Sequence, residues 1–173
     1  MPRPNILLIT SDQQRADCYG FQNPALKTPH LDRLARDGAW FSACITPNLV
    51  CQPSRASILT GQLPLTHGVW DNGVDLDPAV GARGFGGTLA AAGFDTAFIG
   101  KAHFSSKSTF APTGTPEDRH NAALYESGWM GPYMGFEHVE LAVQGHFNKI
   151  RPVPRPPIGH FERWFLTRGR DEE

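Results

Sequence analysis

Cysteine is scarce in this chain of 173 residues, which contains only Cys18, Cys44 and Cys51. An odd, sparse set without Cys-x-x-Cys spacing argues against a disulfide framework and against a zinc finger. An excess of one charge is also lacking, because 16 Lys and Arg side chains stand against 17 Asp and Glu. Without a basic surface, we expect no nucleic-acid partner and no binding to an anionic membrane.

Long apolar runs are missing as well. None approaches the roughly 20 residues that span a bilayer, and the run Asn5–Ile9 is too short for a secretory signal. We therefore expect a cytoplasmic protein without a membrane partner. The 18 Gly and 15 Pro predict many turns, and the chain, with 40% hydrophobic residues, is long enough to bury one core.

Strands and helices alternate over the first hundred residues. The continuous apolar run at 5–10 predicts a strand buried on both faces of a parallel sheet, and 39–46 and 94–99 predict two more. Proline and glycine punctuation predicts helices over 29–38, 53–60 and 88–92. The predicted fold class is therefore α/β, with a mainly parallel sheet flanked by helices.

The pattern weakens beyond about residue 104. Residues 105–126 are polar without a clear period, whereas 136–143 is compatible with a strand. The proline-rich stretch 151–157 fits neither a helix nor a central strand, and 168–173 is charged and expected to fray. We accordingly divide the chain into a domain over 1–150 and a tail over 151–173.

Three polar clusters follow the predicted strands, namely Asp12 with Gln13, the segment Cys51–Arg55, and Lys101 with His103. In open α/β sheets, ligands bind outside the carboxyl ends of the strands. We therefore expect the three clusters to be neighbours across one crevice.

Each cluster has a chemical interpretation and a plainer alternative. Asp12 and Gln13 offer the hard oxygen ligands that Ca²⁺ or Mg²⁺ prefers, although Asp12 could simply cap a turn. Cys51 precedes a predicted helix with Arg55 one turn on, which favours an anion; a lone cysteine is otherwise a small buried residue, our expectation for Cys18 and Cys44.

Lys101 and His103 could bind a second anion oxygen and supply a general acid, although a Lys-x-His pair is often only surface. Other catalytic signatures are absent from the sequence, including the phosphate-binding Walker loop, the dinucleotide fingerprint, the HExxH zinc helix and the GxSxG elbow.

The segment Cys51–Gly61 reads C-Q-P-S-R-A-S-I-L-T-G. It closely resembles the C-x-P-S-R-A-S-x-L-T-G signature of the type I sulfatases in the alkaline-phosphatase superfamily. Supporting matches occur in the family's order and cover most of residues 3–104, with a further match later: Pro4–Ile9 running into Asp12, Thr28–Ala35, Gly100–His103 and Gly135–His138.

The resemblance implies an alkaline-phosphatase-like fold and hydrolysis of small sulfate esters. Cys51 would be oxidised to formylglycine by the formylglycine-generating enzyme, which reads the proline and arginine that follow. One hydroxyl of the hydrated aldehyde would attack sulfur, and loss of the other proton would expel sulfate. By the same resemblance Asp12, Gln13 and residue 51 would hold Ca²⁺, with Mg²⁺ or Mn²⁺ as alternatives.

The remaining site residues follow from the same resemblance. Arg55 would hold the diol and offset the charge of the sulfate. Lys101 would clamp a sulfate oxygen, and His103 would orient the diol or assist its deprotonation. Asn72 is a candidate for contact with the substrate.

Two departures from the family pattern shape the expectation. Gln13 stands where the family commonly has a second aspartate, which removes one charge from the metal site. The family's downstream Asp-Asn or Asp-His ligand pair has no counterpart in 104–173, since Glu117-Asp118 and Asp171 do not match it. We therefore interpret residues 1–150 as the N-terminal part of a sulfatase catalytic domain, with the fold incomplete.

Alternative functions remain open at this point. A phosphonate or phosphate monoester hydrolase of the same superfamily is the nearest, although Lys101 and His103 favour sulfate. A truncated, non-catalytic relative would retain only half of the anion site. A thiol hydrolase that uses unmodified Cys51 lacks an evident base, apart from the distant His103.

Overall fold

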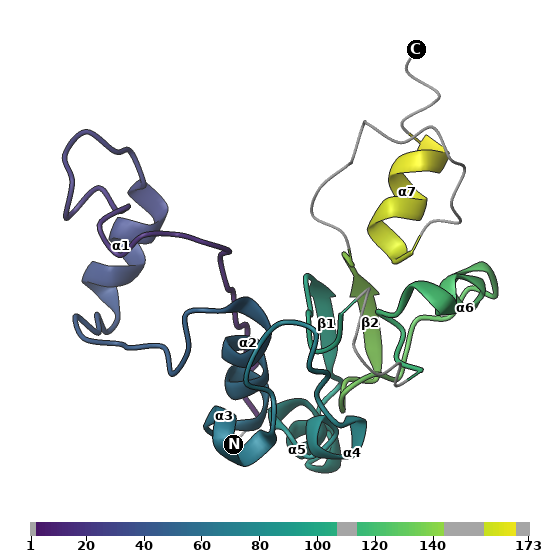
Figure 1. The fold of residues 1–173 in the computed structure, drawn as a ribbon. Coiled ribbons are helices and arrows are strands. Elements are labelled where there is room, and N and C mark those ends of the chain that lie inside the picture. Colours follow the sequence, from purple (N-terminus) through teal and green to yellow (C-terminus); the bar gives the residue numbers. More distant parts are fainter. Residues whose placement is uncertain (1–2, 107–113, 144–157, 169–173) are drawn as a thin grey trace. The chain divides into compact units, whose positions relative to one another are not determined.

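The computed structural model describes residues 3–106, 114–143 and 158–168. The chain forms two compact units, Met1–Ile45 and Thr46–Glu173 (Figure 1). The first unit contains helix α1 (Pro29–Asp37), as its sequence predicts. Pro29 suits the helix start because the first helical N–H needs no partner within the helix. The hydroxyl of Thr28 accepts from the Gly20 N–H and donates to Asp32, at 2.7 Å each.

The strands predicted at 5–10 and 39–46 are wrong for the described structure. Neither segment is a strand, and the apolar run is exposed, with 62% of Ile6 and 80% of Ile9 accessible. A strand exists through pairing with a neighbour, and no described segment pairs with either run. The predicted burial of two cysteines is also not met, since Cys44 is exposed and Cys18 only half-buried.

Four helices open the second unit. They are α2 (Cys51–Thr60), α3 (Pro64–His67), α4 (Pro78–Gly81) and α5 (Phe85–Ala91). Helix α2 contacts the other three (Figure 1). The helices predicted over 53–60 and 88–92 are thereby confirmed, with earlier starts.

A parallel pair of strands follows. Strand β1 (Ala97–Gly100) pairs with β2 (His138–Leu141), with Ala97 opposite His138 and Gly100 opposite Leu141. Strand β2 lies within the strand predicted over 136–143, and β1 overlaps the one predicted over 94–99 but ends one residue later. The connection between them contains the short helix η1 (Arg119–Asn121) and α6 (Ala122–Glu126), in a region where the sequence indicated no regular element. These helices are too short to produce a visible hydrophobic period.

The core of this unit joins α2 to the sheet. Its buried members include Ala56 and Leu59 from α2 and Val139 and Leu141 from β2. Helix α7 (His160–Arg168) packs on β2, where the imidazole Nδ1 of His160 accepts from the Leu141 N–H at 2.9 Å.

The proline-rich stretch 151–157 and residues 169–173 lie outside the described part of the chain. Among the helices described, none combines the length and the apolar character that crossing a bilayer requires.

Candidate active site

Helix α2 places Cys51 at its first position. Val50 is the N-cap, and the first backbone bond of the helix joins the Ser54 N–H to the Val50 carbonyl at 3.2 Å. Pro53 is tolerated because the first N–H groups of a helix have no partner within it. Gly61 ends the helix in the left-handed conformation, at φ 68°. Cys51 is half-buried at this helix start.

Gln52, the next residue, is completely buried and connects three segments. Its side-chain N–H donates to the Val74 carbonyl at 2.8 Å. Its side-chain oxygen accepts from the Gly73 N–H at 2.9 Å and from the Ser106 hydroxyl at 2.8 Å. One amide side chain therefore fixes the start of α2 against the 73–74 loop and against the segment that follows β1.

Asn72 lies beside the same helix start. Its side-chain oxygen accepts from the backbone N–H of Gln52 at 3.0 Å and so satisfies one of the donors that α2 leaves unpaired. Asn72, which the sequence predicts to contact substrate, is therefore bonded to the residue next to Cys51, and its side-chain oxygen caps the helix.

Arg55 connects α2 to the residues after β1. Its guanidinium donates to the backbone carbonyl of Lys101 at 2.5 Å. Two of the three predicted clusters, the segment Cys51–Arg55 and the pair Lys101 and His103, therefore belong to adjoining segments. The third, Asp12 with Gln13, belongs to the first unit.

His103 has an unusual backbone conformation, with φ at 52°. The carboxylate of Glu117, 2% exposed, accepts from three consecutive backbone N–H groups: His103 at 2.7 Å, Phe104 at 2.9 Å and Ser105 at 3.1 Å. The hydroxyl of Tyr133 donates to the same carboxylate at 2.9 Å.

Burial raises the pKa of Glu117 to about 7, against the opposing effect of these four donors. Burial, together with the charge of Glu117, raises the pKa of Tyr133 well above its ordinary value. The hydroxyl therefore stays protonated at neutral pH and can act as a donor to the carboxylate.

A buried pair of side chains, Ser57 and His67, also supports α2. The His67 Nδ1 accepts from the Val69 N–H at 3.1 Å, so the proton of the neutral ring is on Nε2, which donates to the Ser57 hydroxyl at 2.9 Å. Burial lowers the pKa of His67. The bond joins α2 to α3, and its direction prevents His67 from acting as a base toward Ser57.

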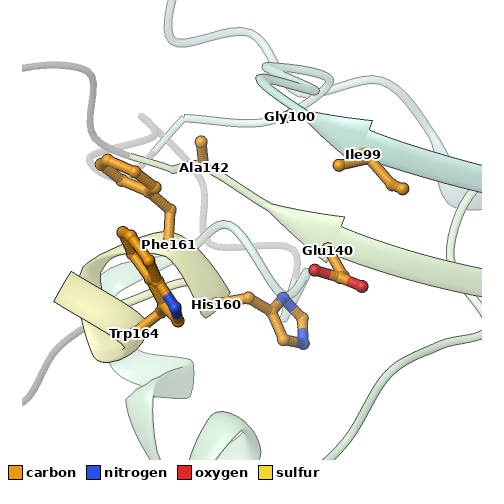
Figure 2. Close-up of a pocket in the computed structure, with 7 residues that line it drawn as sticks. All are labelled: Ile99, Gly100, Glu140, Ala142, His160, Phe161 and Trp164. Atoms are coloured by element: carbon orange, nitrogen blue, oxygen red, sulfur yellow. The ribbon is translucent and has the colours of Figure 1, made fainter. Parts of the chain in front are cut away.

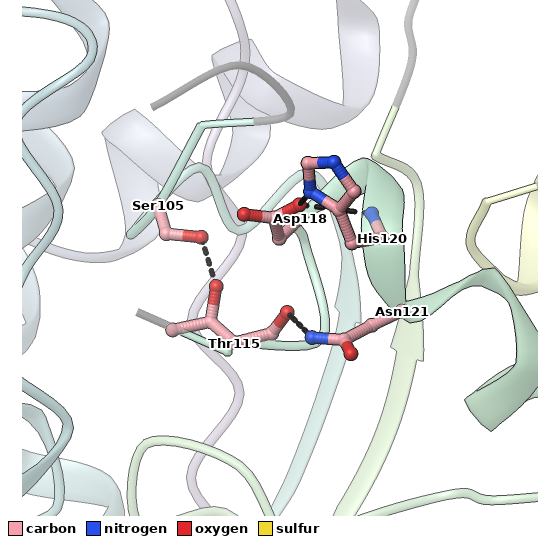
Figure 3. A network of polar contacts seen from close by, with 5 residues as sticks. All are labelled: Ser105, Thr115, Asp118, His120 and Asn121. Atoms are coloured by element: carbon pink, nitrogen blue, oxygen red, sulfur yellow. Dashed lines mark hydrogen bonds and ion pairs between the residues drawn. The ribbon is translucent and has the colours of Figure 1, made fainter. Parts of the chain in front are cut away.

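Glu117 and Asp118 have structural uses in the described residues. Glu117 holds the segment 103–105, while Asp118 accepts from the His120 backbone N–H at 2.9 Å and lies 2.7 Å from the His120 ring Nδ1 (Figure 3). No cluster of three or more His, Cys, Asp or Glu suited to a metal occurs among the described residues.

Sequence reasoning missed the roles of Gln52 and Glu117. Gln52 occupies the variable position of the signature, and its partners lie about twenty or more residues away. Glu117 lies 12–14 residues beyond its backbone partners, in a polar segment. The signal available for Gln52 was an amide side chain on the side of a short helix that faces the core, where a polar group needs hydrogen-bond partners.

A cavity of about 270 Å³ lies elsewhere in the second unit (Figure 2). Residues of β1, β2 and α7 line it, including Ile99, Glu140, His160 and Trp164. None of Cys51, Arg55, Lys101 and His103 is among its lining residues. The cavity therefore holds none of these predicted site residues, although Gly100, the residue before Lys101, lines it.

The metal ligands expected from the sequence fit a hard cation in donor type. Asp12 and Gln13 supply a carboxylate and an amide oxygen, both on exposed residues, and Gln13 has a positive φ of 56°. Ca²⁺ takes about six to eight oxygen ligands, so these two side chains can supply only part of its coordination.

Comparisons with known proteins give a consistent result. The family model described as sulfatase matches residues 4–139. The chain is 36% identical over 124 residues to an ulvan-active sulfatase of Formosa agariphila, covering 71% of this chain and 24% of that protein. It is 42% identical over 106 residues to a multifunctional alkaline phosphatase superfamily protein of Trinickia caryophylli, covering 58% of this chain and 20% of that protein.

A solved structure extends the likeness to the fold. The phosphonate monoester hydrolase of Agrobacterium radiobacter matches with a TM-score of 0.64 and 28% identity, covering 98% of this chain and 30% of that one. The fold is therefore alkaline-phosphatase-like, as the sequence predicted. The chain spans about a quarter of the length of the curated relatives it matches.

Proposed function

Because the chain belongs to the sulfatase family, we propose that it contributes the nucleophile half of a site that hydrolyses sulfate esters. Hydrolase chemistry is what its relatives' names have in common. The proposal assigns the nucleophile position to Cys51 and anion-binding roles to Arg55 and Lys101. His103 is assigned proton handling, and Asn72 contact with the substrate.

One observation carries the proposal. The signature residues form a helix that starts at Cys51, and Arg55 of that helix is bonded to the backbone of Lys101. Residues that the sequence separates by almost fifty positions are therefore held in adjoining segments. A site that binds an anion needs positive groups beside its nucleophile, and this bond joins the segments that carry Arg55 and Lys101.

The chain's own residues would divide the work as follows. Backbone N–H groups at the start of α2 carry the positive end of the helix dipole, which favours an anion next to Cys51. Arg55 and Lys101 add positive charge where a sulfate oxygen gains negative charge. The imidazole of His103 would accept or return a proton at the nucleophile oxygen.

Two groups complete this chemistry. A formylglycine derived from Cys51 would, in its hydrated form, supply a hydroxyl nucleophile and a second hydroxyl whose proton can be removed. A divalent metal, Ca²⁺ by expectation, would polarise the sulfate oxygens. Asp12, Gln13 and residue 51 are the ligands this chain would offer to it, and the formylglycine-generating enzyme is the partner that the proposal requires.

Phosphonate monoester hydrolysis is the second candidate. The structural match to the Agrobacterium radiobacter enzyme, which covers nearly the whole chain, favours it specifically. Because sulfate and phosphonate monoesters present similar anionic oxygens, the residues proposed above would serve either reaction.

The test compares two matched substrates. The chain is joined to the downstream part of a sulfatase, which restores the remaining ligands, co-expressed with the formylglycine-generating enzyme, and assayed with an aryl sulfate and with a phosphonate monoester of the same phenol. We expect faster release of phenol from the sulfate, and none with Cys51→Ser. A faster phosphonate reaction would favour the second candidate. No release from either ester, with residue 51 converted, would mean that the chain is a non-catalytic relative.

A further inference from the structure

The carboxylate of Glu117 lies at the centre of a convergent set of donors. One oxygen accepts from the Phe104 and Ser105 N–H groups and from the Tyr133 hydroxyl, and the other accepts from the His103 N–H. Successive backbone N–H groups aimed at one point form the kind of concavity that binds anions in other proteins. In this chain the anion is a side chain of the protein, so the concavity is already occupied.

The segment that carries Glu117 is anchored to the same loop by a second contact. The Ser105 hydroxyl is hydrogen-bonded to the Thr115 hydroxyl, and the Asn121 side chain donates to the Thr115 carbonyl at 2.7 Å (Figure 3). Tyr125 donates to the Pro116 carbonyl at 2.6 Å. The segment before Glu117 is therefore fixed by these bonds to Thr115 and Pro116. Its carboxylate can then hold residues 103–105 in one position.

His103 has a backbone conformation that needs such support. A positive φ is uncommon for a residue other than glycine, and it persists where surrounding contacts hold it. The 2.7 Å bond from the His103 N–H to Glu117 acts on the atom that defines this angle. The direction of the imidazole depends on the same angle, because the side chain leaves from the α-carbon that φ rotates.

We propose that Glu117 is a positioning residue for His103. By gathering three consecutive N–H groups, it holds the left-handed backbone from which the imidazole projects. The role of His103 in hydrolysis rests on the proposed function, whereas the dependence of its backbone on Glu117 does not. Glu117, a buried acid in a segment where the sequence shows no regular pattern, would thereby influence the reaction at Cys51 through His103.

The first experiment measures the backbone directly by NMR on the isotope-labelled chain. Glu117→Gln keeps the shape but replaces one acceptor oxygen by an N–H donor, which faces the loop donors or Tyr133. We expect the coupling between the amide and α-protons of His103 and its α-carbon shift to move toward values for negative φ. Tyr133→Phe is the matched control, because it removes a donor to the same carboxylate without altering the loop. At a pH above the titration of Glu117 in both chains, the His103 signals should keep their wild-type values.

The second experiment links the position of His103 to the reaction. In the chain joined to the downstream part of a sulfatase, with residue 51 converted, Glu117→Gln should lower kcat about 10- to 100-fold, the effect expected for a misplaced catalytic group, and leave KM nearly unchanged. A variant that only loosened the fold would lose active protein in proportion to its unfolded fraction. The folded fraction of each variant is therefore measured in parallel.

A third comparison serves if Glu117→Gln does not fold. Glu117→Asp keeps the charge but withdraws the carboxylate by one methylene, and its urea midpoint is measured in two backgrounds, His103→Gly and His103→Ala. Glycine adopts positive φ freely, so Glu117→Asp should lower the midpoint less in the His103→Gly background.

The outcomes separate the two proposals. Unchanged His103 signals in a folded Glu117→Gln chain, or equal midpoint losses in the two backgrounds, would overturn the positioning role. Absence of hydrolysis by the wild-type chain counts against the proposed function alone, since the NMR and urea measurements do not depend on activity.

Discussion

Single buried polar residues organise the surroundings of Cys51. Gln52 and Glu117 are both almost fully inaccessible, and each has partners for its polar atoms in other segments. An unsatisfied buried polar group costs about 1–3 kcal/mol, so each residue favours the one arrangement of loops that supplies its partners. The arrangement of the loops around Cys51 therefore depends on polar contacts as well as on the hydrophobic core.

The protonation of Glu117 should make stability depend on pH. Its pKa in the folded chain is about 7, against an ordinary value of 4.5. Between these values the unfolded chain releases a proton that the folded chain keeps, so stability should fall as pH rises from about 4.5 through about 7. The loss approaches about 3 kcal/mol. Urea unfolding across this range measures it.

Two variants check this assignment. Glu117→Gln cannot titrate and should show no such slope over the same pH range. Tyr133→Phe removes a donor that lowers the pKa of Glu117, so the slope should extend to higher pH. An identical slope in the wild-type and Glu117→Gln chains would show that another group is responsible.

At the scale of elements, the contact between α2 and α3 depends on one imidazole. Burial lowers the pKa of His67 below its ordinary 6.5. The unfolded chain therefore takes up a proton first as pH falls, and stability should decrease below about pH 6.5, opposite in sign to the effect of Glu117. His67→Asn retains an acceptor for the Val69 N–H without titrating. In urea unfolding, this variant should no longer lose stability as pH falls below about 6.5. Ser57→Ala should weaken the packing of α2 but keep that dependence on pH.

The elements also show which features a sequence can predict. Helix α2 was recognisable because a glycine able to adopt positive φ closes it, and β1 because its apolar run ends where polar residues begin. The run at 5–10 gave an equally clear pattern and is not a strand, because pairing depends on a partner segment that local pattern does not reveal. The bonds from Glu117 to residues 103–105 likewise depend on the crossover between β1 and β2, which no short window contains.

At the scale of the whole molecule, the chain represents about a quarter of its curated relatives' length, and it includes the signature and the residues after β1. The cytoplasmic location and the sulfate-ester substrate stay predictions. The second unit has a core of its own that joins α2 to the sheet. The nucleophile segment is thus supported independently of the metal ligands expected at Asp12 and Gln13.

Calcium binding should accordingly be weak in this chain. Asp12, Gln13 and residue 51 supply too few of the roughly six to eight oxygens that Ca²⁺ takes. Calorimetry should detect no binding of micromolar or tighter affinity, and Asp12→Asn should change the heat little. Micromolar affinity that Asp12→Asn abolishes would mean that the chain supplies a nearly complete metal site.

The mass of the peptide that spans Cys51, measured after co-expression with the formylglycine-generating enzyme, tests the central claim most directly. We expect residue 51 to be converted to formylglycine while Cys18 and Cys44 keep their thiols. Arg55→Ala should reduce the conversion, because the arginine belongs to the element that the enzyme is expected to read. The account is contradicted if Cys51 keeps its thiol in cells that convert a control sulfatase, and most clearly if that unmodified chain still hydrolyses sulfate esters.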